Sequence, residues 1–284
     1  DRGWQAQGFV FDGAIAAYLL APTDGSYELD KLGAQYFQKT LPPAKEYLGA
    51  KVWKDAAGAQ AAGQVMASHA ALLFALYALL PEKLAAFGLT KVYEDIELPL
   101  CPVLAEMEQA GMLVDEQALA QFGAGLTAGI AALQEEIWAQ AGEEFNLNST
   151  QQLGRVLFEQ LGLPPVKKTK TGYSTSAEVL EKLRPHHPII DLILEYRQLT
   201  KLNSTYVEGL SKVIAGDGRI HTCFQNTVTA TGRLSSTDPN LQNIPIRTDL
   251  GAEIRKMFVP KKGFVLVDAD YSQIELRLLA HIAD

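Results

Sequence analysis

Two carboxylates, Asp268 and Asp270, come directly after an apolar run near the end of the chain and just before a helical pattern. The run Phe264–Val267 follows Lys-Lys-Gly and is typical of a short strand. From Ile274 onward, apolar residues recur at every fourth position, which predicts a helix. A carboxylate held between the end of a strand and the start of a helix is rigid and open to solvent. The pattern therefore suits a metal ligand.

The start of the predicted helix has a second interpretation. Ser272 can act as its N-cap, and Glu275, three residues on, completes the spacing of a capping box. A lone Asp at such a junction is more often a cap or a turn residue than a ligand. The whole octapeptide from Asp270, Asp-Tyr-Ser-Gln-Ile-Glu-Leu-Arg, favours catalysis, because eight specified residues arise by chance with a probability on the order of 10⁻⁸. It resembles the first catalytic motif of the family A DNA polymerases.

A second motif lies upstream, from Thr229 to Pro245: Thr-Ala-Thr-Gly-Arg-Leu-Ser-Ser-Thr-Asp-Pro-Asn-Leu-Gln-Asn-Ile-Pro. It resembles the segment with which the same family grips the primer-template duplex. The two motifs occur in the order and at the spacing of the family. The chain is therefore identified as a member of the family A DNA polymerases, of the bacterial DNA polymerase I type, and the resemblance covers essentially all 284 residues.

The resemblance implies template-directed DNA synthesis, in which the primer 3′-hydroxyl attacks the α-phosphate of a dNTP with the help of two Mg²⁺ ions. Asp270 would ligate both metals, together with the carbonyl of Tyr271. Glu275 would crowd the sugar 2′ position and exclude ribonucleotides. Asp268 is left out, because other members carry non-acidic residues there. The nucleotide-binding positions implied are Ser272, Gln273, Ile274 and Glu275.

The resemblance also implies the residues that bind primer-template DNA. Donors in the minor groove grip every correct base pair, because purine N3 and pyrimidine O2 are presented by all of them. The positions that match this role are Arg233, Asn240, Gln242, Asn243 and Gln273, with Arg247 near the primer end. On its own, the polar segment 200–206 is typical of a loop between helices, and the resemblance makes it the tip of the thumb. Its phosphate-facing candidates are Lys201, Asn203, Ser204 and Thr205.

The fold class expected is mixed α/β, with two partial domains. Residues 1–91 would be an incomplete 3′–5′ exonuclease-like domain of the ribonuclease H-like type. Residues 92–284 would be part of a DNA polymerase domain, with base helices at 92–144, a helical thumb at 145–215 and a portion of the palm at 216–284. The palm portion would carry the catalytic motif.

The exonuclease-like part is expected to be inactive. The last acidic motif of such nucleases, a Tyr with an Asp four residues on, should fall where this chain has Val65 and His69. The first motif would lie before Asp1, which looks like a cut inside a longer protein. His69 has no second ligand nearby in sequence, and a satisfied core or surface histidine is the more common situation.

Patterning predicts further elements along the chain. A short strand should precede an apolar helix within 9–20, a turn should occupy 22–25, and the proline-bearing segment 91–102 marks the domain boundary. Lys167–Gly172 is expected to be a flexible basic loop, and 219–226 a strand. The helices expected are 29–37, 70–80, 103–110 capped by Gly111, 116–141 opened by Asp115, Ser149 to Leu161 ended by Gly162, 176–183 and 189–199.

The net charge of −8 argues at first sight against a nucleic-acid partner. Residues 1–140 carry 8 basic and 17 acidic side chains, whereas the remainder carries 17 and 16. Phosphate binding depends on local clusters, so we expect the second half to face DNA. No uninterrupted apolar run approaches eighteen residues, so no membrane span is expected. The two cysteines show no disulfide or metal spacing, which fits a reducing cytoplasm. The protein is expected to be cytoplasmic and a monomer.

The fingers helix and the strand with the second catalytic Asp would both lie beyond Asp284. The chain alone is therefore expected not to extend a primer. Two other classes stay open. A nuclease is disfavoured by Val65 and His69, and a non-catalytic DNA-binding fragment describes the chain as it stands.

Overall fold

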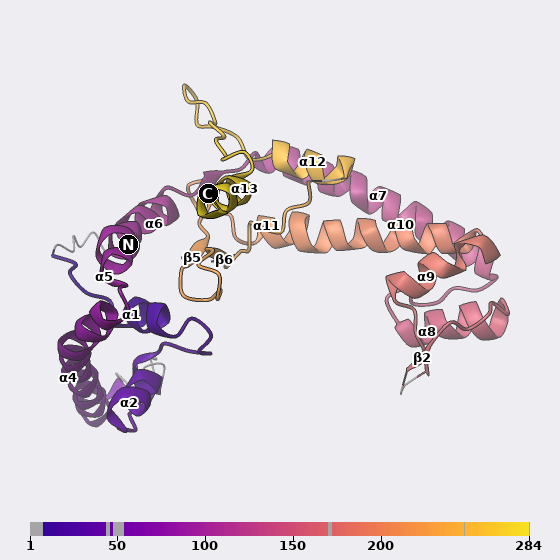
Figure 1. The fold of residues 1–284 in the computed structure, drawn as a ribbon. Helices are drawn as coiled ribbons and strands as arrows, with labels where there is room; N and C mark the ends of the chain where they lie inside the picture. Colours follow the sequence, from indigo (N-terminus) through magenta and orange to yellow (C-terminus); the bar gives the residue numbers. More distant parts are fainter. Residues whose placement is uncertain (1–7, 44–45, 48–53, 170–171, 247, 284) are drawn as a thin grey trace. The chain divides into compact units, whose positions relative to one another are not determined.

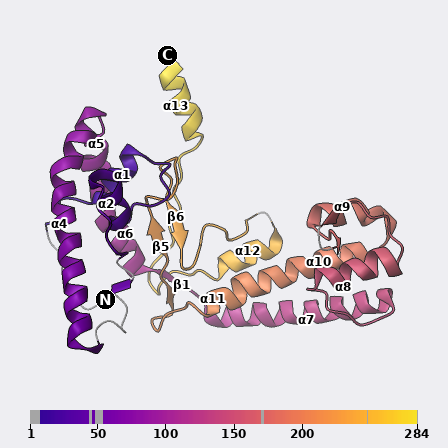
Figure 2. The same cartoon turned by 90° about the horizontal axis from the view of Figure 1, so that it is seen from below.

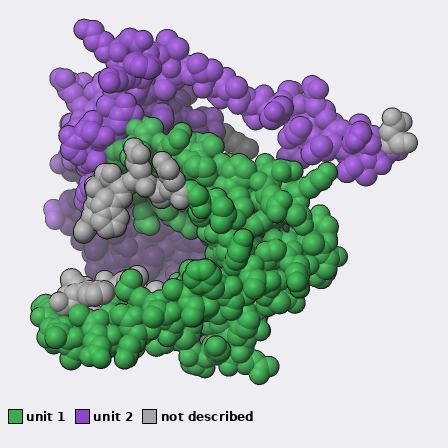
Figure 3. All heavy atoms as spheres, turned by 90° about the vertical axis from the view of Figure 1, so that its left-hand side faces the viewer, with its two compact units in different colours: residues 1–111, 221–243 green, residues 112–220, 244–284 purple. Residues whose placement is uncertain are grey.

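The computed structural model of the chain describes residues 8–43, 46–47, 54–169, 172–246 and 248–283 (Figures 1 and 2). Their contacts divide the chain into two compact units, coloured separately in Figure 3. Unit 1 comprises Asp1–Gly111 and His221–Asn243, and unit 2 comprises Met112–Ile220 and Ile244–Asp284. The chain thus leaves unit 1, returns to it for a short segment and leaves it again.

Unit 1 is mainly helical, with one two-stranded antiparallel sheet among its described residues. Its elements are α1 (Gly13–Leu20), α2 (Leu29–Phe37), α4 (Ala56–Ala86), α5 (Thr90–Val92), the π-helical η2 (Tyr93–Glu97), α6 (Leu98–Ala110), β5 (Cys223–Gln225) and β6 (Ser235–Thr237). The helix predicted at 29–37 and the turn at 22–25 are confirmed. β5 and β6 pair with Phe224 opposite Ser236.

The long helix α4 provides one wall of the unit 1 core. Its buried leucines recur every fourth residue, at Leu72, Leu76, Leu80 and Leu84, and this stripe packs against α1 and α2. The predicted helix at 70–80 is therefore confirmed and extends in both directions. α4 is also long and apolar enough to cross a membrane, by length and composition only. That is weak evidence, because core helices of soluble proteins pass the same test.

The strand expected before α1 does not form. Residues 8–12 pair with no other strand, and the backbone of Asp12 is bonded to a side chain. The hydroxyl of Tyr93 accepts from the Asp12 amide at 2.8 Å and donates to the Asp12 carbonyl at 3.0 Å. The Asp12 carboxylate caps α1 by accepting from the amides of Ala14 and Ile15. A strand is stable only when its backbone groups bond to a neighbouring strand. Here the backbone of Asp12 bonds to the Tyr93 hydroxyl instead, and its side chain caps α1.

The segment predicted as a domain boundary is a nearly continuous helical stretch. α5, η2 and α6 follow one another from Thr90 to Ala110, with Pro99 in the first turn of α6. Tyr93 is buried in the core of unit 1, so the compact unit continues past residue 91 to Gly111. Gly111 ends α6 at φ +56°, as expected for a helix C-cap. The assignment of residues 1–91 to a separate domain stays a prediction.

Unit 2 is a helical arm, and its described residues form two further two-stranded antiparallel sheets. Its elements are β1 (Met112–Leu113), α7 (Glu116–Ala141), α8 (Thr150–Arg155), the π-helical η3 (Val156–Gln160), β2 (Lys168–Thr169), β3 (Gly172–Tyr173), α9 (Ala177–Leu183), the 3₁₀ turn η4 (Arg184–His186), α10 (Ile189–Leu202), the π-helical η5 (Asn203–Glu208), α11 (Gly209–Ser211), β4 (Arg219–Ile220), α12 (Asp249–Lys256) and α13 (Ile274–Ala283).

Two helical stretches lie side by side along the arm, α7 on one side and α10 with η5 on the other (Figures 1 and 2). They approach closely at Gly123, where an added Cβ would lie 2.6 Å from Cγ1 of Val207. At one end of the arm, α7, α8, α9 and α10 enclose a core of apolar side chains. At the other end, β1 pairs with β4.

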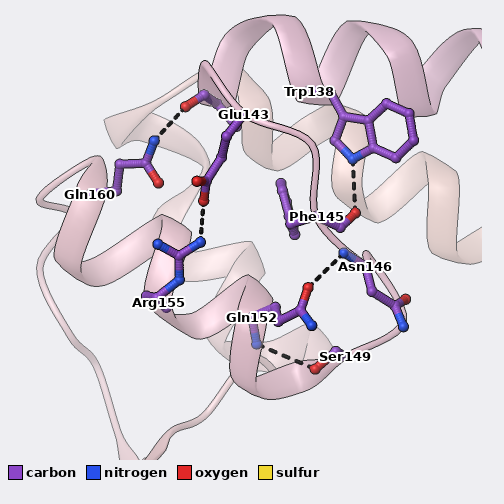
Figure 4. Close-up of polar contacts among 9 residues, drawn as sticks. Trp138, Glu143, Phe145, Asn146, Ser149, Gln152, Arg155 and Gln160 are labelled. Carbon is purple, nitrogen blue, oxygen red and sulfur yellow. Dashed lines mark hydrogen bonds and ion pairs between the residues drawn. The ribbon is translucent and has the colours of Figure 1, made fainter.

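Polar contacts fix the turn from α7 into α8 (Figure 4). The indole Nε1 of Trp138 donates to the carbonyl of Phe145 at 2.8 Å, and Nε2 of Gln160 donates to the carbonyl of Ala141 at 2.8 Å. Ser149 caps α8 by accepting from the amide of Gln152 at 3.3 Å, as predicted. Glu143 and Arg155 form an ion pair. The end of the arm is therefore built to hold its shape.

Two expectations in this region are wrong. Lys167–Gly172 is not a simple loop, because β2 pairs with β3 and forms a short hairpin within it. The strand expected at 219–226 is broken into β4 and β5, which belong to different sheets and different units. The break falls between Ile220 and Cys223, where the chain leaves one unit for the other.

Candidate nucleic-acid interface

The segment with the predicted catalytic carboxylate lies in unit 2. Asp270 and Asp268 are both exposed on an unpaired stretch that leads into α13. The strand predicted at Phe264–Val267 does not form, and its four side chains are 55–85% exposed. An isolated strand is not stable, because its amides and carbonyls need a neighbouring strand. Within the described part of the chain, no other segment pairs with this stretch.

The start of α13 also differs from the prediction. The helix begins at Ile274, and Gln273 precedes it in a left-handed conformation at φ +54°. Ser272 is therefore one residue too early to be the N-cap. Its carbonyl instead accepts from Nε of Arg277 at 2.9 Å, inside the predicted motif. Positive φ at a non-glycine residue costs roughly 1 kcal/mol or more, so this turn is held by the surrounding contacts.

The site offers part of what a two-metal centre requires. Asp270 supplies a carboxylate and Tyr271 a main-chain carbonyl, and oxygen donors are what Mg²⁺ prefers. Across the residues that the structure describes, however, no three acidic, histidine or cysteine side chains gather as a metal site. The donors present therefore match the ion in type but do not by themselves complete the centre that phosphoryl transfer needs.

Four of the predicted duplex-binding residues, Arg233, Asn240, Gln242 and Asn243, lie in unit 1, on and after the β5–β6 hairpin, whereas Gln273 lies in unit 2. Arg233, Asn240 and Asn243 are exposed. Beneath them, a buried hydroxyl pair holds the hairpin, because Oγ1 of Thr222 lies 2.6 Å from Oγ of Ser236 and also contacts the carbonyl of Pro239 at 2.8 Å. The exposed side chains are therefore carried by a hairpin whose strands are held together by these hydrogen bonds.

The side chain of Gln242 also helps to hold the hairpin. Its Nε2 donates to the carbonyl of Leu234 at 3.0 Å, and its Oε1 accepts from the amide of Ser236 at 3.3 Å. The amide of Gln242 itself donates to Oδ1 of Asn240 at 2.9 Å. The carboxamide of Gln242 therefore holds the loop against β6. Its Nε2 carries two hydrogens, and only one of them is used in these bonds.

The segment 200–206 is helical and not a loop, because α10 continues through η5 into α11. Lys201, Ser204 and Thr205 are exposed on this helix, and Nδ2 of Asn203 donates to Glu208 at 3.0 Å. The segment is also not the tip of the arm. Figures 1 and 2 place α8 and α9 at the far end of the arm, whereas β4 is the next element after α11. Helical periodicity continues here because Leu202 and Tyr206 are both buried.

The predicted site residues therefore fall into three groups. The residues from Asp270 to Glu275 are contiguous in unit 2, the helical group around Lys201 lies elsewhere in unit 2, and the hairpin group is in unit 1. Arg247 lies outside the described residues.

Several residues that hold this surface carry no signal in the sequence. Tyr18 of α1 is 3% exposed, and its hydroxyl donates to the carbonyl of Thr229 at 2.7 Å. Glu108 of α6 accepts from the amide of Phe224 at 2.6 Å, and the carbonyl of Glu108 lies 2.7 Å from Nδ1 of His221. These contacts join residues 113 or more positions apart, which no local pattern could predict.

Neither cysteine is suited to thiolate chemistry. Burial raises the pKa of Cys223, and the nearby Glu108 carboxylate raises it further. Burial likewise raises the pKa of Cys101, with Asp12 adding to the effect. Both thiols are free and stay protonated at neutral pH. His69, considered as a metal ligand, is buried and its Nε2 lies 3.1 Å from the carbonyl of Pro42, which confirms it as a satisfied core histidine.

A hollow at the far end of the arm combines arginines with hydroxyls. Arg197 donates to the carbonyl and to Oγ1 of Thr175, the latter at 3.2 Å, and burial lowers the pKa of its guanidinium. The other residues around the hollow, which include one carboxylate, are Thr150, Gln151, Arg155, Glu159, Gly172, Tyr173, Ser174 and Ser176. Such a lining can donate to the oxygens of a phosphate.

Comparison with known proteins identifies the family. The family model for DNA polymerase family A matches residues 116–284, more than half of the chain. The chain belongs to the family A DNA polymerases. Its resemblance in the two motifs is thereby confirmed.

Family A relatives align over nearly the whole chain. DNA polymerase I of Geobacillus stearothermophilus is 45% identical over 285 residues, which cover 100% of this chain and 32% of that protein. DNA polymerase I of Caldicellulosiruptor bescii is 47% identical over 277 residues, which cover 96% of this chain and 30% of that protein. The chain therefore spans about a third of the length of these relatives.

A solved family A structure has the same fold. The POL domain of Pol1 from M. smegmatis, in complex with DNA primer-template and dNTP, superposes with a TM-score of 0.82 at 39% sequence identity. The match covers 99% of this chain and 47% of that one. The mixed helical fold with few strands is therefore that of a family A polymerase domain.

Proposed function

We propose that the protein to which this chain belongs carries out template-directed DNA synthesis, joining a dNTP to the 3′-hydroxyl of a primer. The observation that carries the proposal is the octapeptide from Asp270, present in a chain whose fold superposes on a primer-template complex at a TM-score of 0.82. Replication and repair are the processes that need this reaction. Primer-template DNA and dNTP are then the substrates.

In this proposal Asp270 and the carbonyl of Tyr271 hold Mg²⁺. When bound, two such ions would neutralise charge on the reacting phosphate. Ser272, Gln273 and Ile274 shape the nucleotide site around the left-handed turn at Gln273. Glu275 occupies the first turn of α13, where its bulk would exclude a 2′-hydroxyl.

The exposed side chains of the hairpin supply the grip on the duplex. Arg233, Asn240 and Asn243 can donate to minor-groove acceptors that every matched pair presents. Gln242 closes the loop that carries them and retains one donor hydrogen. Arg247 and Gln273 complete the set. Lys201, Asn203, Ser204 and Thr205 contact the sugar-phosphate backbone from the side of a helix, not from the tip of a thumb.

The domain assignment is part of the proposal. Residues 1–91 are a remnant of a 3′–5′ exonuclease-like domain without nuclease activity, and residues 92–284 begin the polymerase domain. The buried, satisfied His69 supports the absence of nuclease chemistry in its vicinity. The two free, partly buried cysteines fit a reducing cytoplasm. A monomer is also part of the proposal.

A primer-extension experiment tests the function. The protein made from the full reading frame that contains this chain should add nucleotides to a labelled primer in the order dictated by the template, with Mg²⁺ and all four dNTPs. Removal of Mg²⁺ with a chelator should stop the reaction. Addition that ignores the template, or none at all, would reject the proposal. Metal-dependent shortening of single-stranded DNA would instead favour the nuclease alternative.

A further inference from the structure

The hydroxyl of Tyr18 connects helix α1 to a segment 211 residues away. Tyr18 is 3% exposed, and its ring meets that of Tyr27 edge-on, with centroids 5.7 Å apart. A buried tyrosine hydroxyl needs a hydrogen-bond partner. Here the partner is the carbonyl of Thr229, 2.7 Å away, in the turn between β5 and β6.

That turn leads directly to Arg233. The same Thr229 carbonyl accepts from the amide of Gly232 at 3.4 Å, and Oγ1 of Thr229 donates to the carbonyl of Arg233 at 2.7 Å. Gly232 has φ +78°, a conformation that glycine adopts without strain. The turn is therefore closed on itself, and Tyr18 holds its first residue to α1.

We propose that Tyr18 is a positioning residue for DNA binding: its buried hydroxyl fixes the Thr229–Arg233 turn and thereby sets where the Arg233 guanidinium meets the duplex. The inference rests on the proposed function, because the contact of Arg233 with DNA belongs to it. Tyr18 itself is too buried to touch DNA. The N-terminal helices would then serve the polymerase reaction as the support of its duplex-binding loop.

The root of the hairpin is held separately, which makes the effect of Tyr18 local. The carboxylate of Glu108 in α6 accepts a hydrogen bond from the amide of Phe224 at 2.6 Å, and the carbonyl of Glu108 lies 2.7 Å from Nδ1 of His221. The Thr222–Ser236 hydroxyl pair joins the two strands from within. Removing the Tyr18 hydroxyl should therefore loosen the turn and leave β5 and β6 in place.

Tyr18→Phe removes the hydroxyl and keeps the ring. Tyr27→Phe is the matched control, because Tyr27 is also a buried tyrosine whose hydroxyl donates to a backbone carbonyl, that of Ala21 at 2.6 Å, with no bond to the hairpin. In Tyr18→Phe, hydrogen exchange of the amides from Thr229 to Arg233 should quicken, by about threefold or more for one lost hydrogen bond. In Tyr27→Phe it should stay unchanged.

Affinity for a primer-template duplex, measured by fluorescence anisotropy with the 284-residue chain, tests the positioning role. Tyr18→Phe should weaken binding about threefold to tenfold, and Arg233→Ala about tenfold or more. If Tyr18 acts through Arg233, the double variant should bind no worse than Arg233→Ala alone. Thr229→Val removes the other bond of the turn and should reproduce the Tyr18→Phe result, even if Tyr18→Phe folds poorly.

The outcomes distinguish the positioning role of Tyr18 from the proposed function on which it rests. If Arg233→Ala weakens binding while Tyr18→Phe and Thr229→Val do not, the positioning role is wrong and the proposed function stands. If Tyr18→Phe and Tyr27→Phe weaken binding equally, or if Tyr18→Phe and Arg233→Ala add, Tyr18 is a core residue only. If the unsubstituted chain does not bind the duplex, or Arg233→Ala changes nothing, the proposed interface fails and the positioning role fails with it.

Discussion

Asp268 and Asp270 lie two residues apart on one exposed stretch, so the two carboxylates have the same side chain and a similar exposure to solvent. Only their places in the motif distinguish them. Asp270 begins the octapeptide and precedes the left-handed turn at Gln273, whereas Asp268 closes the apolar run. This pair therefore offers a controlled comparison at the scale of single side chains.

In the complete protein, Asp270→Asn should lower the rate of single-turnover dCTP incorporation on the order of a thousandfold or more, because a neutral amide cannot replace a charged metal ligand. Asp268→Asn should leave the rate near that of the unsubstituted protein. Quenched-flow measurement of both variants decides the assignment. Equal losses would show that position 270 has no special part in metal binding.

Glu275 should act by its bulk, so charge and size must be separated. Glu275→Ala opens space at the sugar and should reduce the preference for dCTP over rCTP about tenfold or more, equivalent to ~1.4 kcal/mol. Glu275→Gln keeps the size and should retain most of the preference. Competition between dCTP and rCTP gives the ratio directly. A loss with Gln as large as with Ala would mean that the carboxylate charge, not its volume, excludes ribonucleotides.

Among the elements, the pairing of α7 with α10 and η5 depends on one glycine. An added Cβ at Gly123 would lie 2.6 Å from Cγ1 of Val207, and β-branched Val207 has little freedom to rotate away. Gly125, two residues along the same helix, would meet nothing within 4 Å. Close approach of the two helices thus requires glycine at position 123, whereas position 125 has room for a Cβ.

Gly123→Ala should destabilise the chain by about 1–3 kcal/mol through overpacking. Gly125→Ala should stabilise it by up to about 1 kcal/mol, because alanine favours a helix over glycine. Urea unfolding followed by circular dichroism measures both. Stabilisation by Gly123→Ala would show that the helices can move apart without cost.

The helix that carries the segment 200–206 offers a test of its phosphate contacts. Lys201→Ala should lower the slope of log affinity against log salt by about one, as expected for one lost phosphate contact. Lys212→Ala changes another exposed lysine, the C-cap residue directly after α11, and should leave the slope unchanged. Anisotropy titrations at several salt concentrations give the slopes. If both variants lower the slope alike, binding depends on overall charge and not on this segment.

The sequence predicts elements that depend on local patterns and fails where an element needs a distant partner. The helix at 29–37, the Asp115-capped helix α7 and the Ser149 cap are as predicted, because propensity and capping are local. The strands at 9–11 and 264–267 are absent, because strands need neighbours. The family could be predicted from its motifs. The hydrogen bonds by which Tyr18 and Glu108 hold the hairpin could not be predicted, because they join residues far apart in the sequence.

For the whole molecule, no three acidic, histidine or cysteine side chains gather as a metal site among the described residues. The 284-residue chain by itself should therefore bind primer-template DNA without extending it, because one carboxylate motif cannot hold two catalytic metals. A primer-extension gel with Mg²⁺ and four dNTPs checks this. Templated products from the pure chain would contradict it, provided that a mock purification from the same host gives none.

The return of residues 221–243 to unit 1 has a consequence for synthesis on the ribosome. Chains grow from the N-terminus, so the helices of unit 1 emerge long before the hairpin that completes them. Until Thr229 and Phe224 have emerged, the Tyr18 hydroxyl and the Glu108 carboxylate lack the partners they have in the finished fold. Meanwhile α7 and α10 have already emerged and can pair. The part of the chain made first is thus among the last to be finished. A nascent chain stalled before residue 221 would have an unfinished unit 1, although its helical arm could already have formed.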